Sequence, residues 1–115
     1  MAQSKTELFA QMAREQPDNE MIWYGLGSEY IKEGKWSEAA EALRQVVLLK
    51  PDYTAAYQML GTALVNLGER DAAREAWTKG MAVAERTGAW KARQHMESLL
   101  KDADAGKEQS GLCGS

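Results

Sequence analysis

Hydrophobic residues recur along this chain at the spacing of helices that bury one face. The first stripe follows the pattern i, i+3, i+4, i+7, i+8 of an amphipathic helix and consists of Trp23, Leu26, Gly27, Tyr30 and Ile31. The second stripe consists of Trp36, Ala39, Ala40, Leu43, Val46 and Val47. Gly34 lies between the stripes, where a glycine is typical of a left-handed residue just past a helix end. The segment therefore predicts two helices joined by a short turn.

The same arrangement returns 34 residues later. Pro17-Asp18 recurs as Pro51-Asp52, Leu26-Gly27 as Leu60-Gly61, and Gly34 as Gly68. Further pairs at this offset are Ala39 with Ala73, Glu41 with Glu75, and Ala42 with Ala76. So many matches at one offset, with the glycines in phase, indicate a duplicated unit. We expect Pro51 to end the second helix of the first unit and Asp52 to cap the helix that follows.

Small residues in the stripes predict how the helices pack. Gly27 and Gly61 lie in mid-helix, where glycine costs about 1 kcal/mol relative to alanine. That cost is tolerable where a neighbouring helix comes too close for a side chain, and we expect Ala39 and Ala73 on the facing helices. Three tryptophans lie on the buried-type stripes, so we expect core positions rather than ligand anchors for Trp23, Trp36 and Trp77.

The flanking segments are predicted to cover the ends of the repeat pair. Ser4 and Glu7 form a capping box that opens a helix over 4–16, with Phe9 in the register of Leu43. A last helix over 88–101 carries Trp90, Ala92, Met96, Leu99 and Leu100. We therefore expect one domain over 1–101, with end helices 4–16 and 88–101 as caps, and repeats over 20–53 and 54–87.

The carboxyl-terminal stretch 102–115 is polar and rich in glycine. Such a segment buries too little apolar surface to offset its ordering entropy, so we expect a disordered tail. Cys113 would then be an exposed thiol, and no second ligand nearby gives it a redox or metal role. Because it is the single cysteine, a disulfide scaffold is excluded.

Composition narrows the class of protein without identifying a partner. The 115 residues include 14 Lys and Arg against 17 Asp and Glu, a net charge of −3. This mild acidity favours neither nucleic acid nor an anionic membrane as a partner. No apolar run reaches the ~18 residues of a membrane span, and no apolar segment of a signal peptide follows Met1. Two prolines, a single phenylalanine and many Ala, Glu, Leu, Lys and Met residues favour an all-α chain, and we expect the cytoplasm by default.

The sequence contains no group of residues with the spacing that a catalytic site needs. His95 is the single histidine, and no pair of residues has the spacing of metal ligands. Gly25 and Gly27 do not form a dinucleotide-binding motif, because Tyr30 stands at the third glycine place. The carboxylates are scattered as on solvated helix faces. We expect no enzyme, no cofactor and no metal.

The two units resemble the tetratricopeptide repeat. The first reads Trp23-x2-Leu26-Gly27-x2-Tyr30, then Ala39-x3-Leu43 and Pro51, and differs from the family pattern over 34 residues only in Leu43 for phenylalanine. The second unit matches at Tyr57, Leu60, Gly61, Ala73 and Trp77, and departs at Leu64, Gly80 and Glu85. The resemblance is to a small bacterial-type protein with two repeats and helical caps. It implies an all-α solenoid of antiparallel helix pairs with about six helices.

The resemblance also implies a concave groove lined by the first helix of each repeat, which holds a peptide or helix of a partner protein. Aligned by the tryptophan position, the groove residues are Met21, Tyr24, Ser28, Ile31, Lys32, Ala55, Gln58, Thr62, Val65 and Asn66. If Trp90 takes the tryptophan place of a degenerate third unit, Lys91 and His95 join them. Family members that bind the carboxyl terminus of heat-shock chaperones use lysine, asparagine and arginine at such places. Here only Lys91 fits, so we do not predict that clamp.

Two other functions stay open beside the peptide-binding adaptor. One is a self-associating scaffold, with Trp90 and Met96 near an exposed end of the array. The other is a chaperone dedicated to one client. We expect a monomer or a weak homo-oligomer, and the sequence does not identify the partner.

Overall fold

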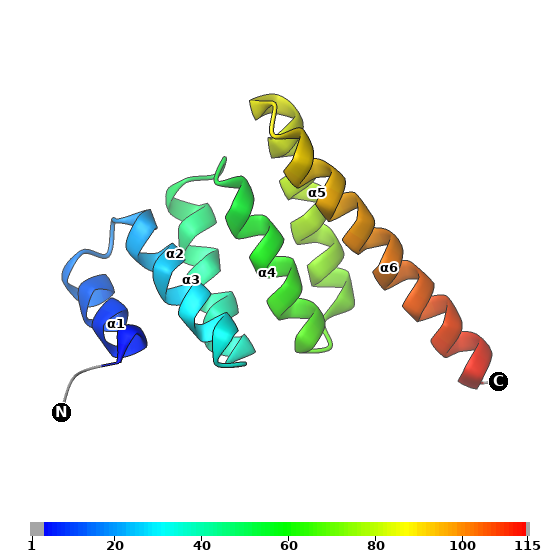
Figure 1. The fold of residues 1–115 in the computed structure, drawn as a ribbon, viewed down its shortest axis with the longest axis horizontal. Helices are drawn as coiled ribbons and strands as arrows, with labels where there is room; N and C mark the ends of the chain where they lie inside the picture. Colours follow the sequence, from blue (N-terminus) through cyan, green and yellow to red (C-terminus); the bar gives the residue numbers. More distant parts are fainter. Residues whose placement is uncertain (1–3, 115) are drawn as a thin grey trace.

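The computed structural model describes residues 4–114, and the side chains of residues 4–103. Six α-helices and no strand are present in the described part of the chain, which confirms the predicted fold class. They are α1 (Lys5–Glu15), α2 (Glu20–Lys32), α3 (Trp36–Leu49), α4 (Thr54–Asn66), α5 (Arg70–Thr87) and α6 (Trp90–Gly114). Consecutive helices run antiparallel across the molecule, from α1 at one end to α6 at the other (Figure 1).

The helices form two layers. The backbones of α2, α4 and α6 approach one another, whereas within the described residues those of α1, α3 and α5 do not. In Figure 1, α3 and α5 lie behind the nearer α2, α4 and α6. We call α2, α4 and α6 the inner layer and α1, α3 and α5 the outer layer. Because the inner helices are closer together, the array curves toward its inner face.

Short turns with defined caps separate the helices. Ser4 accepts a hydrogen bond from the backbone N–H of Glu7 at 3.1 Å, and Asn19 accepts one from Met21 at 3.1 Å. Gly34 and Gly68 end α2 and α4 with φ of 72° and 81°, as predicted. Asp52 does not cap α4, contrary to our expectation, because the helix starts later and Tyr53 takes the N-cap position without a side-chain hydrogen bond.

Glycines set the spacing of each helix pair. A Cβ on Gly27 would lie 2.8 Å from Cγ of Leu43, and a Cβ on Gly61 would overlap the indole nitrogen of Trp77. Gly80 plays the same part toward α6, where a Cβ would lie 2.5 Å from Sδ of Met96. The mid-helix glycines therefore face close neighbours, as predicted. The nearest atoms belong to these large side chains, and the alanine beside Gly27 is Ala42, whose Cβ would lie 3.6 Å away, rather than the expected Ala39.

Two hydrophobic clusters continue each other along the array. The larger cluster joins α3, α4, α5 and α6 around Leu43, Leu64, Trp77 and Met96. The smaller cluster joins Ala13 of α1 to α2 and α3, with Phe9 packed against it. Trp77 is 3% exposed, and Trp23 and Trp36 are half-buried against the core, so all three tryptophans pack as expected.

The repeat is also marked by one recurring hydrogen bond. Trp23 Nε1 donates to the carbonyl of Pro17 at 2.9 Å, and Tyr57 Oη donates to the carbonyl of Pro51 at 2.6 Å. Each aromatic residue thus ties the first helix of its repeat to the proline turn six residues before it. This hydrogen bond explains why an aromatic residue with a polar N–H or O–H stands six residues after each proline.

The carboxyl-terminal part departs from the predicted boundaries. Glu85 stands where the repeat would place a proline, and α5 continues to Thr87 before Gly88 ends it with φ of 77°. We expected a disordered tail over 102–115, but α6 continues to Gly114. The stretch contains no proline and has several good helix formers, so the backbone can propagate the helix beyond its packed part. The side chain of Cys113 and the whole of Ser115 lie outside the described residues. No helix in the described part is both long and apolar enough to cross a membrane.

Substituting Gly61 by alanine tests the close approach. Alanine favours a helix by about 1 kcal/mol over glycine, yet its Cβ would overlap Trp77. We expect Gly61→Ala to destabilise the fold by about 1–3 kcal/mol, the range for overpacking, in urea unfolding followed by circular dichroism. Thr78→Ala, at an exposed position of α5, is the control and should change stability by less than about 0.5 kcal/mol. A stabilised Gly61→Ala variant would contradict the packing.

Truncating Phe9 tests the capping role of α1. Phe9 packs against the second cluster and stands 2.6 Å from the place of a Cβ on Gly25. We expect Phe9→Ala to cost about 2 kcal/mol, less than a fully buried phenylalanine. Its neighbour Leu8 is 48% exposed, so Leu8→Ala should cost less than about 0.5 kcal/mol. Equal melting temperatures for the two variants would show that α1 does not cover the array.

Candidate functional site

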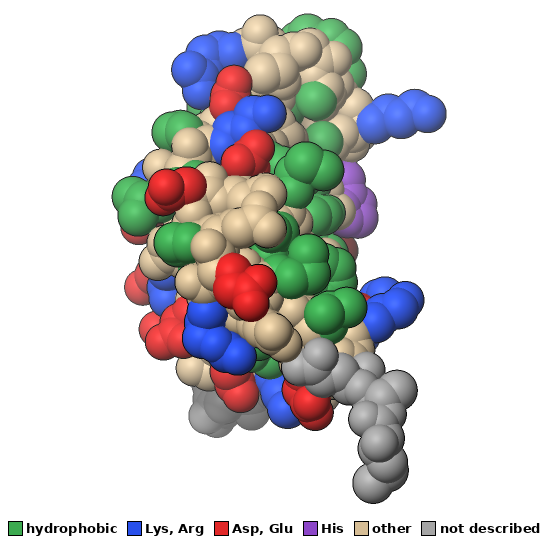
Figure 2. Space-filling model, turned by 90° about the vertical axis from the view of Figure 1, so that its left-hand side faces the viewer, with side chains coloured by type: hydrophobic (Ala, Val, Ile, Leu, Met, Phe, Trp, Pro, Cys, Tyr) green, Lys and Arg blue, Asp and Glu red, His purple; other side chains and the backbone are tan. Residues whose placement is uncertain are grey.

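The groove residues named from the sequence lie on the helices of the inner layer. Ten of the twelve lie on α2 and α4, while Lys91 and His95 lie on α6. Half-buried members are Tyr24, Ser28, Ile31, Gln58, Thr62 and Val65, and exposed members are Met21, Lys32, Ala55, Asn66, Lys91 and His95. Figure 2 shows hydrophobic side chains gathered on the half of the surface that carries the histidine. Members of the set therefore lie on all three helices of the inner layer.

The junction between α2 and α4 contains Met59, which our sequence analysis did not name. Its Sδ lies 3.6 Å from Ser28 Oγ, which donates to it. Met59 is half-buried and packs against the larger core cluster. It occupies the repeat position of Gly25, so alignment of the two repeats gives no signal for a side chain there. A flexible thioether at the centre of the inner face can adapt to different apolar ligands.

Some polar side chains of α4 form hydrogen bonds to carbonyl groups of the same helix. Thr62 Oγ1 donates to the carbonyl of Gln58 at 3.2 Å, and Asn66 Nδ2 donates to the carbonyl of Thr62 at 2.9 Å. The Gln58 carbonyl also accepts Trp77 Nε1 at 3.1 Å. The side-chain amide of Gln58 is therefore the best placed group of α4 for a hydrogen bond to a ligand backbone.

An aromatic pair forms one end of the inner face. The rings of Tyr24 and Tyr53 have centroids 5.0 Å apart at an interplanar angle of 37°, a tilted arrangement that stabilises aromatic pairs. Lys50 Nζ lies 5.8 Å from the centre of the Tyr53 ring. Met21 lies one turn before Tyr24 on α2 and is 68% exposed. This end therefore offers aromatic and apolar surface with a cation beside it.

Tyr53 itself was missed because it belongs to the turn between the repeats. It follows Pro51-Asp52 directly and is half-buried in the structure. Burial raises the pKa of its phenol, and Tyr24 and Glu20 raise that pKa further. A tyrosine next to the proline turn of a repeat is the signal that could have identified it.

The centre of the inner face is electrically neutral. Helix α4, Thr54–Asn66, contains no charged residue. On α2, Lys32 Nζ forms an ion pair with Glu29 Oε2 at 3.2 Å. Lys91 and His95 add positive or titratable groups on α6, both exposed. The face thus lacks the dense cationic clamp that acidic peptide termini require.

Helix α6 joins the array differently from the helices that begin the two repeats. Trp90 is 63% exposed, whereas Tyr57 is buried, so Trp90 does not pack in the equivalent place. Arg93 instead pairs with Glu85 at 2.6 Å and with Glu97 at 2.9 Å. These acids raise the pKa of Arg93, with the Glu85 hydrogen bond as the largest cause. The ion pair with Glu85 links α5 to α6 where the earlier units use a proline carbonyl.

Within the described residues there is no metal centre, and Met96 is not exposed. No group of three or more potential metal ligands is formed there. Met96 is completely buried, against the backbone at Gly80. The end-on association that we considered can therefore use Trp90 but not Met96.

An alkaline titration tests the environment of Tyr53. We expect the absorbance titration of the wild type minus that of Tyr53→Phe to show a phenol that ionises above pH 10, since burial raises its pKa. The folded state holds this proton more tightly, so its contribution to stability is present below pH 10 and is lost as the pH rises through the raised pKa. Tyr30→Phe, almost two turns from Tyr24 on α2, is the control. A difference curve centred at or below pH 10 would contradict the burial of Tyr53.

Comparison with known proteins identifies the family to which this chain belongs. A family model described as tetratricopeptide repeat matches residues 30–92. The "TPR repeat-containing protein PA0015" of Pseudomonas aeruginosa is 36% identical over 87 residues, which cover 76% of this chain and 83% of the relative.

Solved structures agree with the sequence matches. The solution structure of protein BPP2914 from Bordetella parapertussis superposes with a TM-score of 0.78 at 28% identity, covering 95% of this chain and 93% of that one. A tetratricopeptide repeat domain protein from Salinibacter ruber gives 0.71 at 26% identity, covering 78% and 91%. MamA, at 22% identity and a TM-score of 0.64, covers 93% of this chain and 69% of its own and shares the fold. The chain therefore belongs to the tetratricopeptide repeat family, as a small protein of the bacterial type.

Proposed function

We propose that this protein binds an uncharged, partly apolar segment of a partner protein across its inner face. Tetratricopeptide repeats generally mediate protein–protein interactions. The observation that carries the finer proposal is the uncharged helix α4 at the centre of the inner layer. A ligand that crosses it meets apolar and hydrogen-bonding groups and no strong electrostatic field. The binding module acts without catalysis or a cofactor.

The residues of the site divide by their chemistry. Apolar contact comes from Met21, Tyr24, Ile31, Met59, Ala55 and Val65. Hydrogen bonds to a ligand backbone come from Ser28, Gln58, Thr62 and Asn66, each contributing only about 0.5–1.5 kcal/mol net. Lys32, Lys91 and His95 flank this neutral centre. A groove of two repeats is short, so we expect micromolar affinity, about −8 kcal/mol, for a short peptide.

Two features favour an apolar segment over an acidic chain end. The ion pair with Glu29 already neutralises Lys32, so it attracts a carboxylate weakly. Met21, Met59 and the Tyr24–Tyr53 pair together supply adaptable apolar surface. An amphipathic helix or an extended strand with alternating apolar side chains fits such a surface.

Combined substitution of Tyr24, Gln58 and Lys91 by alanine tests the proposal. The variant loses one apolar, one hydrogen-bonding and one cationic contact, one from each inner helix. Proteins retained by immobilised wild type are identified by mass spectrometry, and peptides tiled across each are measured by isothermal titration calorimetry. We expect at least a tenfold loss of affinity for the peptide that binds the wild type.

A matched triple variant on the outer helices is the control. Ser37→Ala, Glu38→Ala and Thr78→Ala change exposed residues of α3 and α5 and should leave the affinity within twofold. Circular dichroism confirms that both variants keep their helices. Equal peptide affinities of the inner-face variant and the wild type would refute binding at the inner face.

A further inference from the structure

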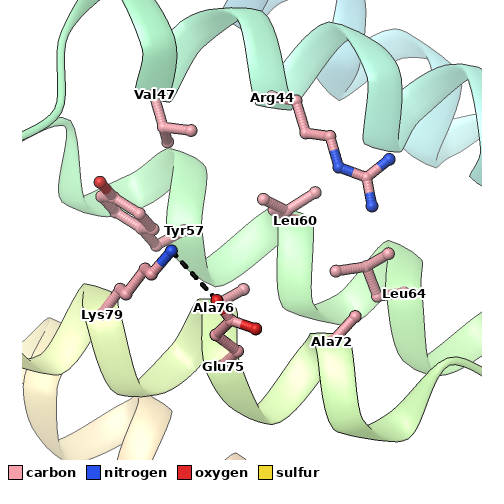
Figure 3. Close-up of a pocket in the computed structure, with 9 residues that line it drawn as sticks. All are labelled: Arg44, Val47, Tyr57, Leu60, Leu64, Ala72, Glu75, Ala76 and Lys79. Carbon is pink, nitrogen blue, oxygen red and sulfur yellow. Dashed lines mark ion pairs between the residues drawn. The ribbon is translucent and has the colours of Figure 1, made fainter.

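The outer face carries a hollow between α3 and α5. Its volume is about 220 Å³. Tyr57, Leu60 and Leu64 of α4 form its floor, and Val47 and Ala76 line its sides. Figure 3 shows these side chains converging on the space, with Arg44 at one edge and the Glu75–Lys79 ion pair, 3.2 Å long, at another. The hollow is apolar at its base and charged at its rim.

A related hollow lies one repeat earlier. Its volume is about 290 Å³, and its lining residues are Trp23, Glu41, Arg44 and Gln45. The 34-residue step relates three of these to residues of the first hollow: Trp23 to Tyr57, Glu41 to Glu75, and Gln45 to Lys79. Such hollows recur because the outer helices are spread apart and leave part of each inner helix uncovered. Arg44 lines both hollows and therefore stands between them.

A ridge with an apolar tip separates the two hollows. Glu41, Arg44 and Leu48 lie at i, i+3 and i+7 of α3, hence on one face of the helix. Leu48 is 73% exposed, the largest value among the large hydrophobic residues of the stretch 4–103 whose side chains are described. Arg44 is exposed and forms no ion pair with any residue in the described part of the chain. The ridge thus offers a protruding apolar side chain and an unpaired cation, beside a hollow with an apolar base and a rim that carries Glu75 in its ion pair with Lys79.

We propose that a second copy of this protein docks on the outer face as a two-fold dimer. The α3 ridge of each copy lies in the hollow between α3 and α5 of the other. Leu48 then contacts Tyr57 and Leu60 of the second copy, and Arg44 lies opposite Glu75 of that copy, where it shares the carboxylate with Lys79. Packing a helix ridge into the groove between two helices is the ordinary geometry of helix contacts.

The self-complementarity of this face is what selects a second copy as the occupant. A two-fold interface places the same patch on both sides, so every protruding feature needs its receptor on the same patch. Here the apolar tip, the apolar hollow, the cation and the carboxylate all lie on α3, α4 and α5. If a different protein docked here, the protruding residues and the hollow of this face would not need to be complementary to each other.

The proposal is tested by the oligomeric state of the full chain. Sedimentation equilibrium over a wide concentration range, up to the millimolar level, gives the dissociation constant of the dimer. We expect a weak dimer for the wild type and at least a tenfold weaker one for Leu48→Glu, because the introduced carboxylate would enter an apolar hollow. Leu67→Glu, at a residue 39% exposed at the end of α4, is the matched control and should dimerise like the wild type. Circular dichroism verifies that both variants are folded.

A charge exchange supplies a second readout. Arg44→Glu should weaken the dimer, and adding Glu75→Lys should restore it, since the pair then reforms between copies with reversed signs. A monomer at every concentration overturns the proposal. So does self-association that persists in Leu48→Glu and is lost in Trp90→Ala, because that result assigns the contact to the end of the array. Neither outcome bears on peptide binding at the inner face.

Discussion

The close approach of paired helices at glycine is the constraint on which the structure depends. Where Gly27 meets Leu43 and Gly61 meets Trp77, the missing Cβ lets a large side chain of the second helix lie against the backbone of the first. Each glycine costs about 1 kcal/mol of helix propensity, and the burial of a leucine or tryptophan side chain more than offsets it. The pairing is local in sequence, so the geometry of each helix pair follows from contacts within its own repeat.

The two candidate surfaces follow from the same geometry. Because the first helices of the repeats lie close together, their exposed sides merge into a single inner face. The second helices lie farther apart, so the outer face is a series of ridges and hollows. A merged face with the neutral helix α4 at its centre suits one continuous segment of a partner. A ridge beside a hollow suits another ridge and hollow, and the exposed Leu48 between two hollows fits that description.

The sequence predicted the features that depend on local periodicity, and it missed those that depend on contacts between units. The helix pairs were predicted from the hydrophobic stripes, the glycines and the prolines. Alignment of the two repeats then named ten groove residues, which lie on α2 and α4. Met59 could not be predicted because its repeat partner is Gly25, and Tyr53 belongs to a turn. The N-cap of α4 differs by one residue from the expected Asp52, because turn geometry rather than residue preference sets it. Likewise, α6 continues past 101 because polar composition is compatible with both a solvated helix and a disordered tail.

The loss of repeat register after Glu85 limits the inner face to two full repeats. A proline at that place would end the helix and let an aromatic residue bind its carbonyl, as Trp23 and Tyr57 do. Instead α5 continues, Arg93 pairs with Glu85, and Trp90 stays exposed. We expect a short face of this kind to bind one peptide only weakly. A dimer through the outer face would leave both inner faces open, and two linked sites bind a partner with two matching segments far more tightly than one site does. Dimerisation would therefore compensate for the short repeat array without any new contact to the ligand.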